Sequence, residues 1–154
     1  MIRLIKNGRV INPATGEDSV RDLWIDQEGL IAHPDPDLTP ADSQVIDASG
    51  HWVLPGLVDL AARFREPGQE HKGDIRSESA AALASGITTV CLPPDTMPVI
   101  DTPAVMELIQ QRTLSCASPR ILMLGAMSSG LQSAQLSELG ALKQAGCVGI
   151  SNAG

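Results

Sequence analysis

The sequence predicts an α/β protein that contains about the first half of an eight-stranded parallel barrel, preceded by a small antiparallel sheet. Two observations predict this fold. From residue 55 onward, short apolar segments alternate with helical segments of about a dozen residues, which is the order of a parallel α/β sheet. Before residue 55, strand-like segments are separated by turn residues instead. The 154-residue chain is 43% hydrophobic and 2% aromatic, so it can bury a core, and that core is aliphatic.

Residues 1–54 are expected to form short strands joined by tight turns. Asn7-Gly8 lies between two apolar segments, and this dipeptide is the strongest short-range hairpin signal. Two prolines within residues 33–37 predict a loop there, because proline cannot donate to a strand ladder. The expected hairpins join residues 4–6 to 9–11, 22–26 to 30–32, and 45–47 to 51–54.

Residues 55–154 are expected to alternate strands and helices. Thr102 with Pro103 predicts a helix start, and Gly86 and Gly146 predict helix ends. Three strand–helix units and a fourth strand make half of an eight-stranded barrel. Because a half barrel leaves apolar edge strands unpaired, we expect the chain to be a fragment of a longer protein. The expected strands are residues 56–60, 88–92, 121–124 and 147–150, and the expected helices are 74–85, 103–113 and 133–145.

Charge and cysteine content exclude several classes of function. The formal net charge is −7 and lysine and arginine do not cluster, so nucleic acid and anionic membranes are poor partners. No apolar run approaches the ~20 residues of a membrane helix. Cys91, Cys116 and Cys147 are odd in number and lack a Cys-x-x-Cys spacing, which argues against a disulfide framework or a zinc knuckle. We therefore expect a protein of the reducing cytoplasm.

Four blocks of sequence carry a resemblance to a known family. They are Leu-Pro-Gly-Leu-Val-Asp-Leu at residues 54–60, Arg-Glu-Pro-Gly at 65–68, Gly-Ile-Thr-Thr-Val at 86–90 and Pro-Asp-Thr-Met-Pro-Val-Ile-Asp at 94–101. With these blocks the chain resembles the dihydroorotases of the cyclic amidohydrolase superfamily. The resemblance implies an amidohydrolase-type (β/α)8 barrel, of which residues 55–154 form the first half. It also implies a small β-sandwich, of which residues 1–54 form the N-terminal part.

The sequence departs from the catalytically active members of that family. Those carry His-x-His just before the Arg-Glu-Pro-Gly block to hold a divalent metal, and here the two positions are Ala61 and Arg63. Alanine has no lone pair and arginine is a permanent cation, so neither ligates a metal. The Ser-Asp-Asp-Gly sequence of many bacterial members is Ser-Asn-Ala-Gly at residues 151–154. Because the hydrolysis requires the metal, we expect no catalytic residue, no metal site and no cofactor.

Three residues mark a remnant of the substrate pocket, namely Arg63, Arg65 and Asp95. The resemblance implies that the arginine at position 65 and an asparagine after the second strand hold the substrate carboxylate in active members. Here Asp95 replaces that asparagine and would repel a carboxylate. Because these residues follow adjacent strands, we expect Arg63 or Arg65 to form an ion pair with Asp95. Arg65 has two interpretations, a remaining role in ligand binding or anchoring of its own turn through Asp95.

The resemblance implies a function in assembly. Several bacteria pair inactive dihydroorotase homologues with aspartate carbamoyltransferase, which needs them to assemble and work, and the losses in this sequence are similar. We therefore expect a non-catalytic, dihydroorotase-like protein of pyrimidine biosynthesis that scaffolds the aspartate carbamoyltransferase catalytic chain and forms a homo-oligomer. Two alternatives stay open. One is an active metal-dependent cyclic amidohydrolase with a reduced metal site, and the other is a module that binds a pyrimidine precursor through Arg65.

Overall fold

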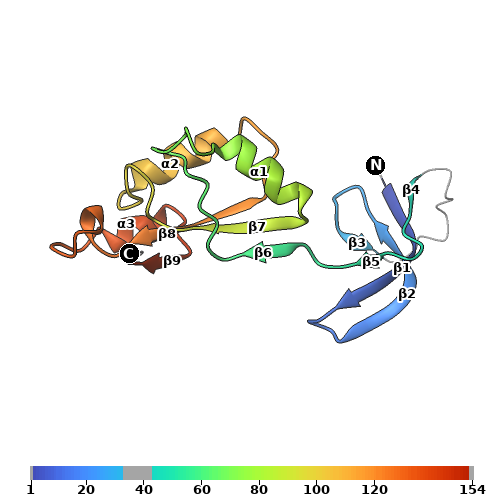
Figure 1. The fold of residues 1–154 in the computed structure, drawn as a ribbon. Coiled ribbons are helices and arrows are strands. Elements are labelled where there is room, and N and C mark those ends of the chain that lie inside the picture. The colour runs from blue at the N-terminus through green and yellow to red at the C-terminus, as the bar shows by residue number, and fades with distance from the viewer. Residues whose placement is uncertain (1, 33–42, 153–154) are drawn as a thin grey trace. The chain divides into compact units, whose positions relative to one another are not determined.

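The computed structural model describes residues 2–32 and 43–152, and the chain divides into two compact units, Met1–Pro55 and Gly56–Gly154 (Figure 1). The loop expected at residues 33–37 lies outside the described residues. None of the helices in the described part of the chain is long and apolar enough to cross a membrane.

A five-stranded sheet forms the first unit. Its strands are β1 (Ile2–Asn12), β2 (Glu17–Ile25), β3 (Ile31–Ala32), β4 (Ser43–Asp47) and β5 (Trp52–Val53). The antiparallel pairing of β2 with β3 confirms the hairpin expected around residues 27–29. The Asp26 carboxylate closes this turn by accepting the backbone N–H groups of Glu28 and Leu30, each at 2.9 Å.

The hairpin expected at Asn7-Gly8 is wrong, because β1 continues through this dipeptide. Between Ile5 and Gly8 the register with β2 shifts, which marks a β-bulge. Asn7 takes the left-handed conformation (φ +60°), which asparagine tolerates, and its N–H donates to the Asp22 carboxylate at 2.9 Å. The Asn-Gly signal for an unusual backbone is correct, but here it produces a bulge rather than a turn.

The hairpin expected within residues 45–54 is also wrong, because β4 and β5 both pair with β1 and run parallel to it. The sheet is therefore mixed rather than antiparallel. The turn between β4 and β5 is held beside the bulge, where the Ala48 N–H donates to the Lys6 carbonyl at 2.8 Å. Gly8 permits this approach, since a Cβ there would lie 2.5 Å from Val53 Cγ2.

Four parallel strands form the sheet of the second unit, in the order β6-β7-β8-β9. They are β6 (Leu57–Asp59), β7 (Ile87–Leu92), β8 (Arg120–Ala126) and β9 (Gly149–Ser151). The helices are α1 (Ile75–Ala84), α2 (Pro103–Thr113) and α3 (Leu139–Gln144). The helices pack on one face of this sheet (Figure 1), which confirms the predicted half of an α/β barrel. The buried core between them is Phe64, Ile75, Ala82, Val90, Leu92, Ile100, Val105, Met106, Ile109, Met123 and Leu142.

The first two helices begin where the sequence predicts. α1 follows Asp74, whose carboxylate accepts the Ser77 N–H at 2.7 Å, while the Ser77 hydroxyl accepts the Asp74 N–H at 3.1 Å. This reciprocal pair satisfies two backbone donors at the helix start. α2 follows Thr102, but the Thr102 side chain makes no capping hydrogen bond. Of the two residues that predict this helix start, only Pro103 has the expected role, at the first helical position.

The third helix is shorter than the expected 133–145 and starts only at Leu139. A short 3-10 segment, η2 (Ser129–Leu131), follows β8, and an irregular loop leads from it to α3. The hydroxyl of Ser128, which lies just before η2, accepts the N–H of Ser133 in this loop at 2.9 Å. Serine hydroxyls that bind nearby backbone groups compete with helix formation, which explains why the helical pattern fails here.

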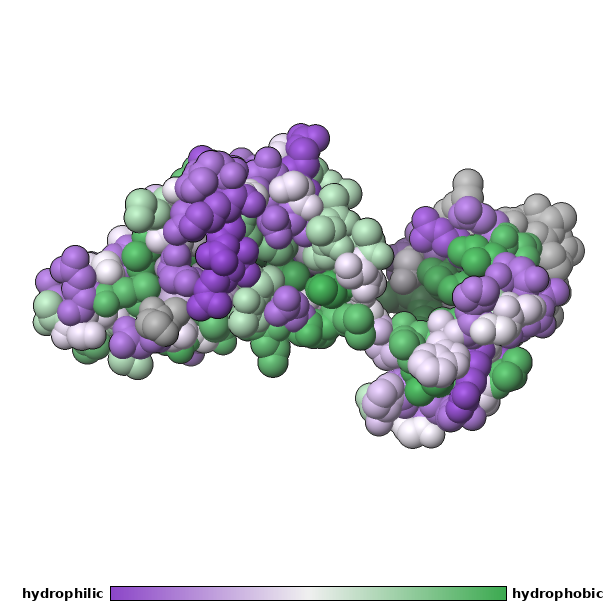
Figure 2. All heavy atoms as spheres, viewed as in Figure 1, coloured by the Kyte–Doolittle hydropathy of each residue, from purple (hydrophilic) through white to green (hydrophobic). Residues whose placement is uncertain are grey.

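Both edges of the second sheet carry exposed apolar residues, as expected for half of a barrel. Leu57, Val58 and Leu60 are exposed on and just after β6, and Val148 and Ile150 are exposed beside and on β9. Figure 2 shows hydrophobic side chains gathered on the side of this unit along which β6 runs. Parallel sheets normally have such side chains covered.

Candidate functional site

Two loops form the candidate site, at the ends of the neighbouring strands β6 and β7. The loop after β6 carries Arg63 and Arg65, and the loop after β7 carries Asp95. The Ala62 N–H donates to the Cys91 carbonyl at 3.0 Å and joins the two segments where the first loop begins. Barrel proteins place their reactive groups at these carboxyl ends of strands.

Arg63 and Asp95 form an ion pair across the two loops, with 2.7 Å between Nε and Oδ2. This confirms the predicted pairing and identifies Arg63 as the partner of Asp95. Both side chains are partly exposed, at 43% for Arg63 and 34% for Asp95. Exposed ion pairs contribute about 0–1 kcal/mol to the free energy of unfolding, so this pair adds little to stability. Its main effect is on the charge of the site.

Arg65 lies in the same loop and has an unusual backbone. Its φ angle is +65°, in the left-handed region that non-glycine residues rarely adopt. The Arg65 carbonyl accepts the Gln69 N–H at 2.7 Å, which closes the turn. The Arg65 side chain is exposed and forms no hydrogen bond or ion pair with another described residue. The turn is therefore not anchored through Asp95, which was one of the two interpretations.

Pro67 and Gly68 join the first loop to the second. The Pro67 carbonyl accepts the Met97 N–H at 2.9 Å. Gly68 has φ +105°, and a Cβ there would lie 2.4 Å from the Met97 carbonyl oxygen, so only glycine fits. Beside this contact is a small pocket whose lining includes Arg63, Arg65, Gln69, Asp95 and Met97.

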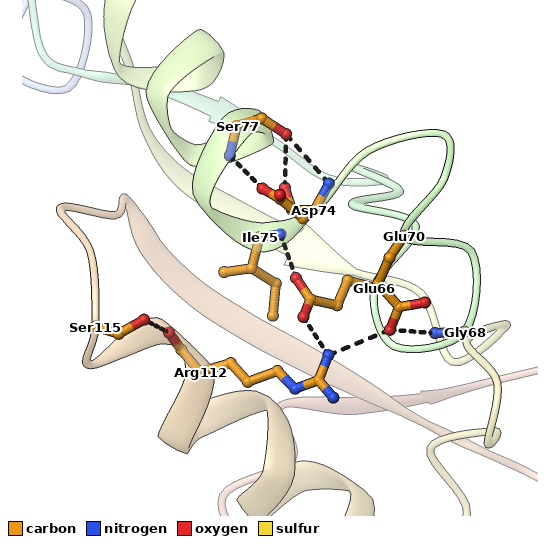
Figure 3. A network of polar contacts seen from close by, with 8 residues as sticks. All are labelled: Glu66, Gly68, Glu70, Asp74, Ile75, Ser77, Arg112 and Ser115. Atoms are coloured by element: carbon orange, nitrogen blue, oxygen red, sulfur yellow. Dashed lines mark hydrogen bonds and ion pairs between the residues drawn. The ribbon is translucent and has the colours of Figure 1, made fainter.

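Glu66 belongs to the same loop but points toward the helices (Figure 3). Its side chain is 13% exposed. One carboxylate oxygen accepts the N–H of Ile75, the first residue of α1, at 2.6 Å, and the other pairs with Arg112 of α2. Arg112 also contacts Glu70, with 3.2 Å between Nη1 and Oε1. Sequence reasoning missed this cluster, because Glu66 and Arg112 lie 46 residues apart and no motif or periodicity joins them.

Hydrogen bonds within this cluster stabilise the charged forms of Glu70 and Arg112. The Gly68 N–H donates to the Glu70 carboxylate at 3.0 Å and holds the pKa of Glu70 below its usual value, and Arg112 adds to the effect. The hydrogen bond with Glu66 raises the pKa of Arg112 above its usual value. Both shifts favour the charged forms of Glu70 and Arg112.

The residues at the end of β6 do not fit a divalent metal. Ala61 offers no donor atom, and Arg63 brings a positive charge whose Nε already donates to Asp95. The carboxylate of Asp59, the last residue of β6, accepts the Ala61 N–H at 2.9 Å. In the part of the chain that the structure describes, no group of three or more His, Cys, Asp or Glu side chains is placed to hold a metal ion.

At the end of β9, as at the ends of β6 and β7, the sequence differs from the one that the resemblance implies for active members. Asn152 is exposed just after the strand, where the resemblance implies an acidic residue in active members. Its amide supplies an oxygen but no negative charge. Ala153 and Gly154 lie outside the described residues.

Comparison with known proteins decides the family. A family model described as Dihydro-orotase-like matches residues 50–154, which include both loops of the site. The chain belongs to the dihydroorotase-like family. A Dihydroorotase-like protein of Pseudomonas putida is 45% identical to this dihydroorotase-like chain over 148 residues, which cover 96% of this chain and 35% of that protein. A Dihydroorotase of Anaeromyxobacter sp. (strain K) is 42% identical over 154 residues, covering 99% of this chain and 35% of that protein. The chain thus spans about a third of the length of these curated relatives.

Solved structures show that the dihydroorotase-like chain shares its fold with amidohydrolase barrels. The L-hydantoinase of Arthrobacter aurescens matches with a TM-score of 0.77 at 24% identity, over 97% of this chain and 32% of that protein. A dihydroorotase matches with a TM-score of 0.60 at 20% identity, over 97% of this chain and 41% of that protein. These matches confirm the predicted amidohydrolase-type fold, and at such identities they concern the fold alone.

Proposed function

We propose that this dihydroorotase-like chain belongs to a non-catalytic protein that scaffolds the assembly and activity of aspartate carbamoyltransferase in pyrimidine biosynthesis. Its partner is the transcarbamoylase catalytic chain, it forms a homo-oligomer, and it works in the cytoplasm. It holds no catalytic metal and does not interconvert carbamoyl aspartate and dihydroorotate. Family membership supports the pathway, and the chemistry of the strand ends supports the non-catalytic role.

The observation that carries the proposal is the ion pair between Arg63 and Asp95. The Arg63 guanidinium brings a fixed positive charge to the strand end where active members hold a divalent cation, and like charges repel. Asp95 brings a carboxylate to the pocket that Arg65 also lines, so it competes with an incoming carboxylate for the arginines. Each partner therefore opposes one of the two components that the hydrolysis needs, the metal and the anionic substrate.

The features that specify the fold are intact in the same unit. α1 keeps its reciprocal cap between Asp74 and Ser77, the core is well buried, and Pro67 and Gly68 still pack against Met97. A fold that persists without the groups needed for hydrolysis supports a role carried by the surface of the protein.

Co-purification of the full-length protein with the transcarbamoylase tests the proposal, with metal content and turnover measured on the same sample. We expect a defined complex, less than stoichiometric metal and no conversion of carbamoyl aspartate or dihydroorotate. Stoichiometric zinc together with turnover that a chelator abolishes would contradict the proposal and support the active amidohydrolase, to which the name of the Anaeromyxobacter relative points.

A second function is favoured by the exposed Arg65 side chain in the pocket. It is the binding of a pyrimidine precursor without turnover. Titration of the full-length protein with carbamoyl aspartate and with dihydroorotate separates this function from scaffolding alone. Saturable binding that Arg65→Ala abolishes would support the binding module, whereas no binding is expected for a scaffold.

A further inference from the structure

Arg112 is distant from the site in the sequence, yet it contacts the loop that forms one wall of the pocket. We infer that Arg112 is a positioning residue. From the last turn of α2 it holds the pocket loop, defined as residues 65–70, in the place from which Arg65 lines the pocket. The inference concerns how the site is built, and it holds whichever of the functions above is correct.

The first contact is with Glu66. One oxygen of the Glu66 carboxylate pairs with Arg112 Nη1 and the other accepts the Ile75 N–H at 2.6 Å. Glu66 thereby binds two helices at once, at the start of α1 and at the end of α2 (Figure 3). A backbone N–H at a helix start has no partner within the helix, so the carboxylate also satisfies a donor that would otherwise lack one.

The second contact is with Glu70, at the other end of the pocket loop. Arg112 Nη1 lies 3.2 Å from Glu70 Oε1, and the same oxygen accepts the Gly68 N–H at 3.0 Å. Arg112 therefore contacts the loop at two carboxylates that enclose Pro67 and Gly68. Because Pro67 and Gly68 pack against Met97 of the second loop, a shift of this segment would alter the wall of the pocket.

The balance of charge explains why the cation is needed. Glu66 is 13% exposed and Arg112 is 37% exposed, so water can replace the lost partner of Glu66 only in part. Without Arg112, two carboxylates would converge on a space with no cation between them. A poorly solvated charge that loses its partner is strongly destabilised. We therefore expect the pocket loop to move when the Arg112 side chain is removed.

Three of the four residues of the Arg-Glu-Pro-Gly block have structural roles that require no ligand. Glu66 ties the loop to two helices, and Pro67 and Gly68 pack against the second loop. In the described part of the chain, Arg65 is the member of the block whose side chain has no such structural contact. Any ligand-binding role left in the block therefore rests on Arg65.

Hydrogen exchange of the full-length protein, measured at single backbone amides, tests the inference. In Arg112→Met we expect the Gly68 and Ile75 amides to exchange about tenfold faster or more, as loss of a charge-assisted hydrogen bond predicts. The Ser77 amide, which donates to Asp74 rather than to this cluster, should keep its rate. The matched control is Arg120→Met, which removes an exposed arginine outside the cluster and should change none of the three rates.

Two exchange patterns would overturn the inference. Unchanged exchange at Gly68 or at Ile75 in Arg112→Met would overturn the inference. Equal acceleration at Ser77 and at the core residue Val90 would also overturn it, because that pattern reports general destabilisation. If Arg112→Met does not fold, Arg112→Gln becomes the test variant with the same two outcomes, since glutamine also removes the cation but keeps a polar side chain beside Glu66 and Glu70.

Discussion

Arg65 combines a left-handed backbone, at φ +65°, with an exposed side chain that forms no ion pair to another described residue. A left-handed conformation costs a residue other than glycine ~1–2 kcal/mol, and such strain gathers at functional sites. We predict that Arg65→Gly has a free energy of unfolding about 1 kcal/mol higher than Arg65→Ala, because only glycine removes this cost. Urea unfolding of the full-length variants measures the difference, and equal stabilities would show that the loop is not strained at Arg65.

The lost metal site gives a second prediction at the scale of residues. We predict that Ala61→His with Arg63→His neither binds stoichiometric zinc nor restores turnover. The two imidazoles would return, but Asp95 would stay in the pocket, then without its partner, and Asn152 would still lack a carboxylate. Metal analysis and an assay in both directions check this. Recovery of activity in the double variant would mean that the other strand ends had kept their function.

The site could be predicted from the sequence only where neighbouring strands bring residues together. Arg63 and Asp95 meet because they follow β6 and β7, and adjacent parallel strands end at one edge of the sheet. Arg112 could not be predicted, because it reaches the site from the far end of a helix and its partners carry no matching pattern in the sequence.

At the scale of elements, the cap of α1 predicts a dependence on pH. The Ser77 N–H lowers the pKa of Asp74 in the folded protein. A carboxyl whose folded pKa is lowered stabilises the protein above its unfolded pKa, and this contribution is lost as the pH falls through the folded pKa. We therefore predict that Asp74→Ala lowers the Tm at neutral pH and has progressively less effect in acid.

Asp74→Asn is the matched control, because asparagine caps a helix without titrating. Its Tm difference from Asp74→Ala should persist in acid. Thermal unfolding of the three proteins across the acid range measures both effects. A Tm loss in Asp74→Ala that is as large in strong acid as at neutral pH would contradict a role for the ionised carboxylate.

Most elements of the second unit were predictable, because apolar strands, caps and helix ends agree along that part of the sequence. The start of α3 was not, because the Ser128 hydroxyl accepts a backbone N–H before this helix begins. In the first unit the same reasoning failed at Asn7-Gly8, where a local signal for a left-handed backbone has two solutions, a turn or a bulge. The pairing of β5 with β1 selects the bulge, and that pairing joins segments about forty residues apart, which local patterns cannot reveal.

At the scale of the molecule, the open sheet edges predict self-association of the 154-residue chain when it is expressed alone. Exposed apolar edge strands pair with other chains, and a lysine on such an edge prevents pairing. We predict that Val58→Lys on β6 and Ile150→Lys on β9 each reduce association, whereas Leu114→Lys, which changes an exposed leucine just after α2 and on no strand, does not. Light scattering over a range of concentrations measures this. A chain that stays monomeric, or associates equally with the edge lysines, would contradict the prediction.

The size and activity of aspartate carbamoyltransferase in cells that lack the full-length gene decide whether the protein is a scaffold. We predict that the transcarbamoylase loses its assembled size and its activity, while a separate dihydroorotase continues to supply dihydroorotate. Complementation with the wild-type gene should restore both, and so should complementation with Arg65→Ala, because scaffolding does not need the pocket that Arg65 lines. A transcarbamoylase of unchanged size and activity in the deletion strain would contradict the scaffold function.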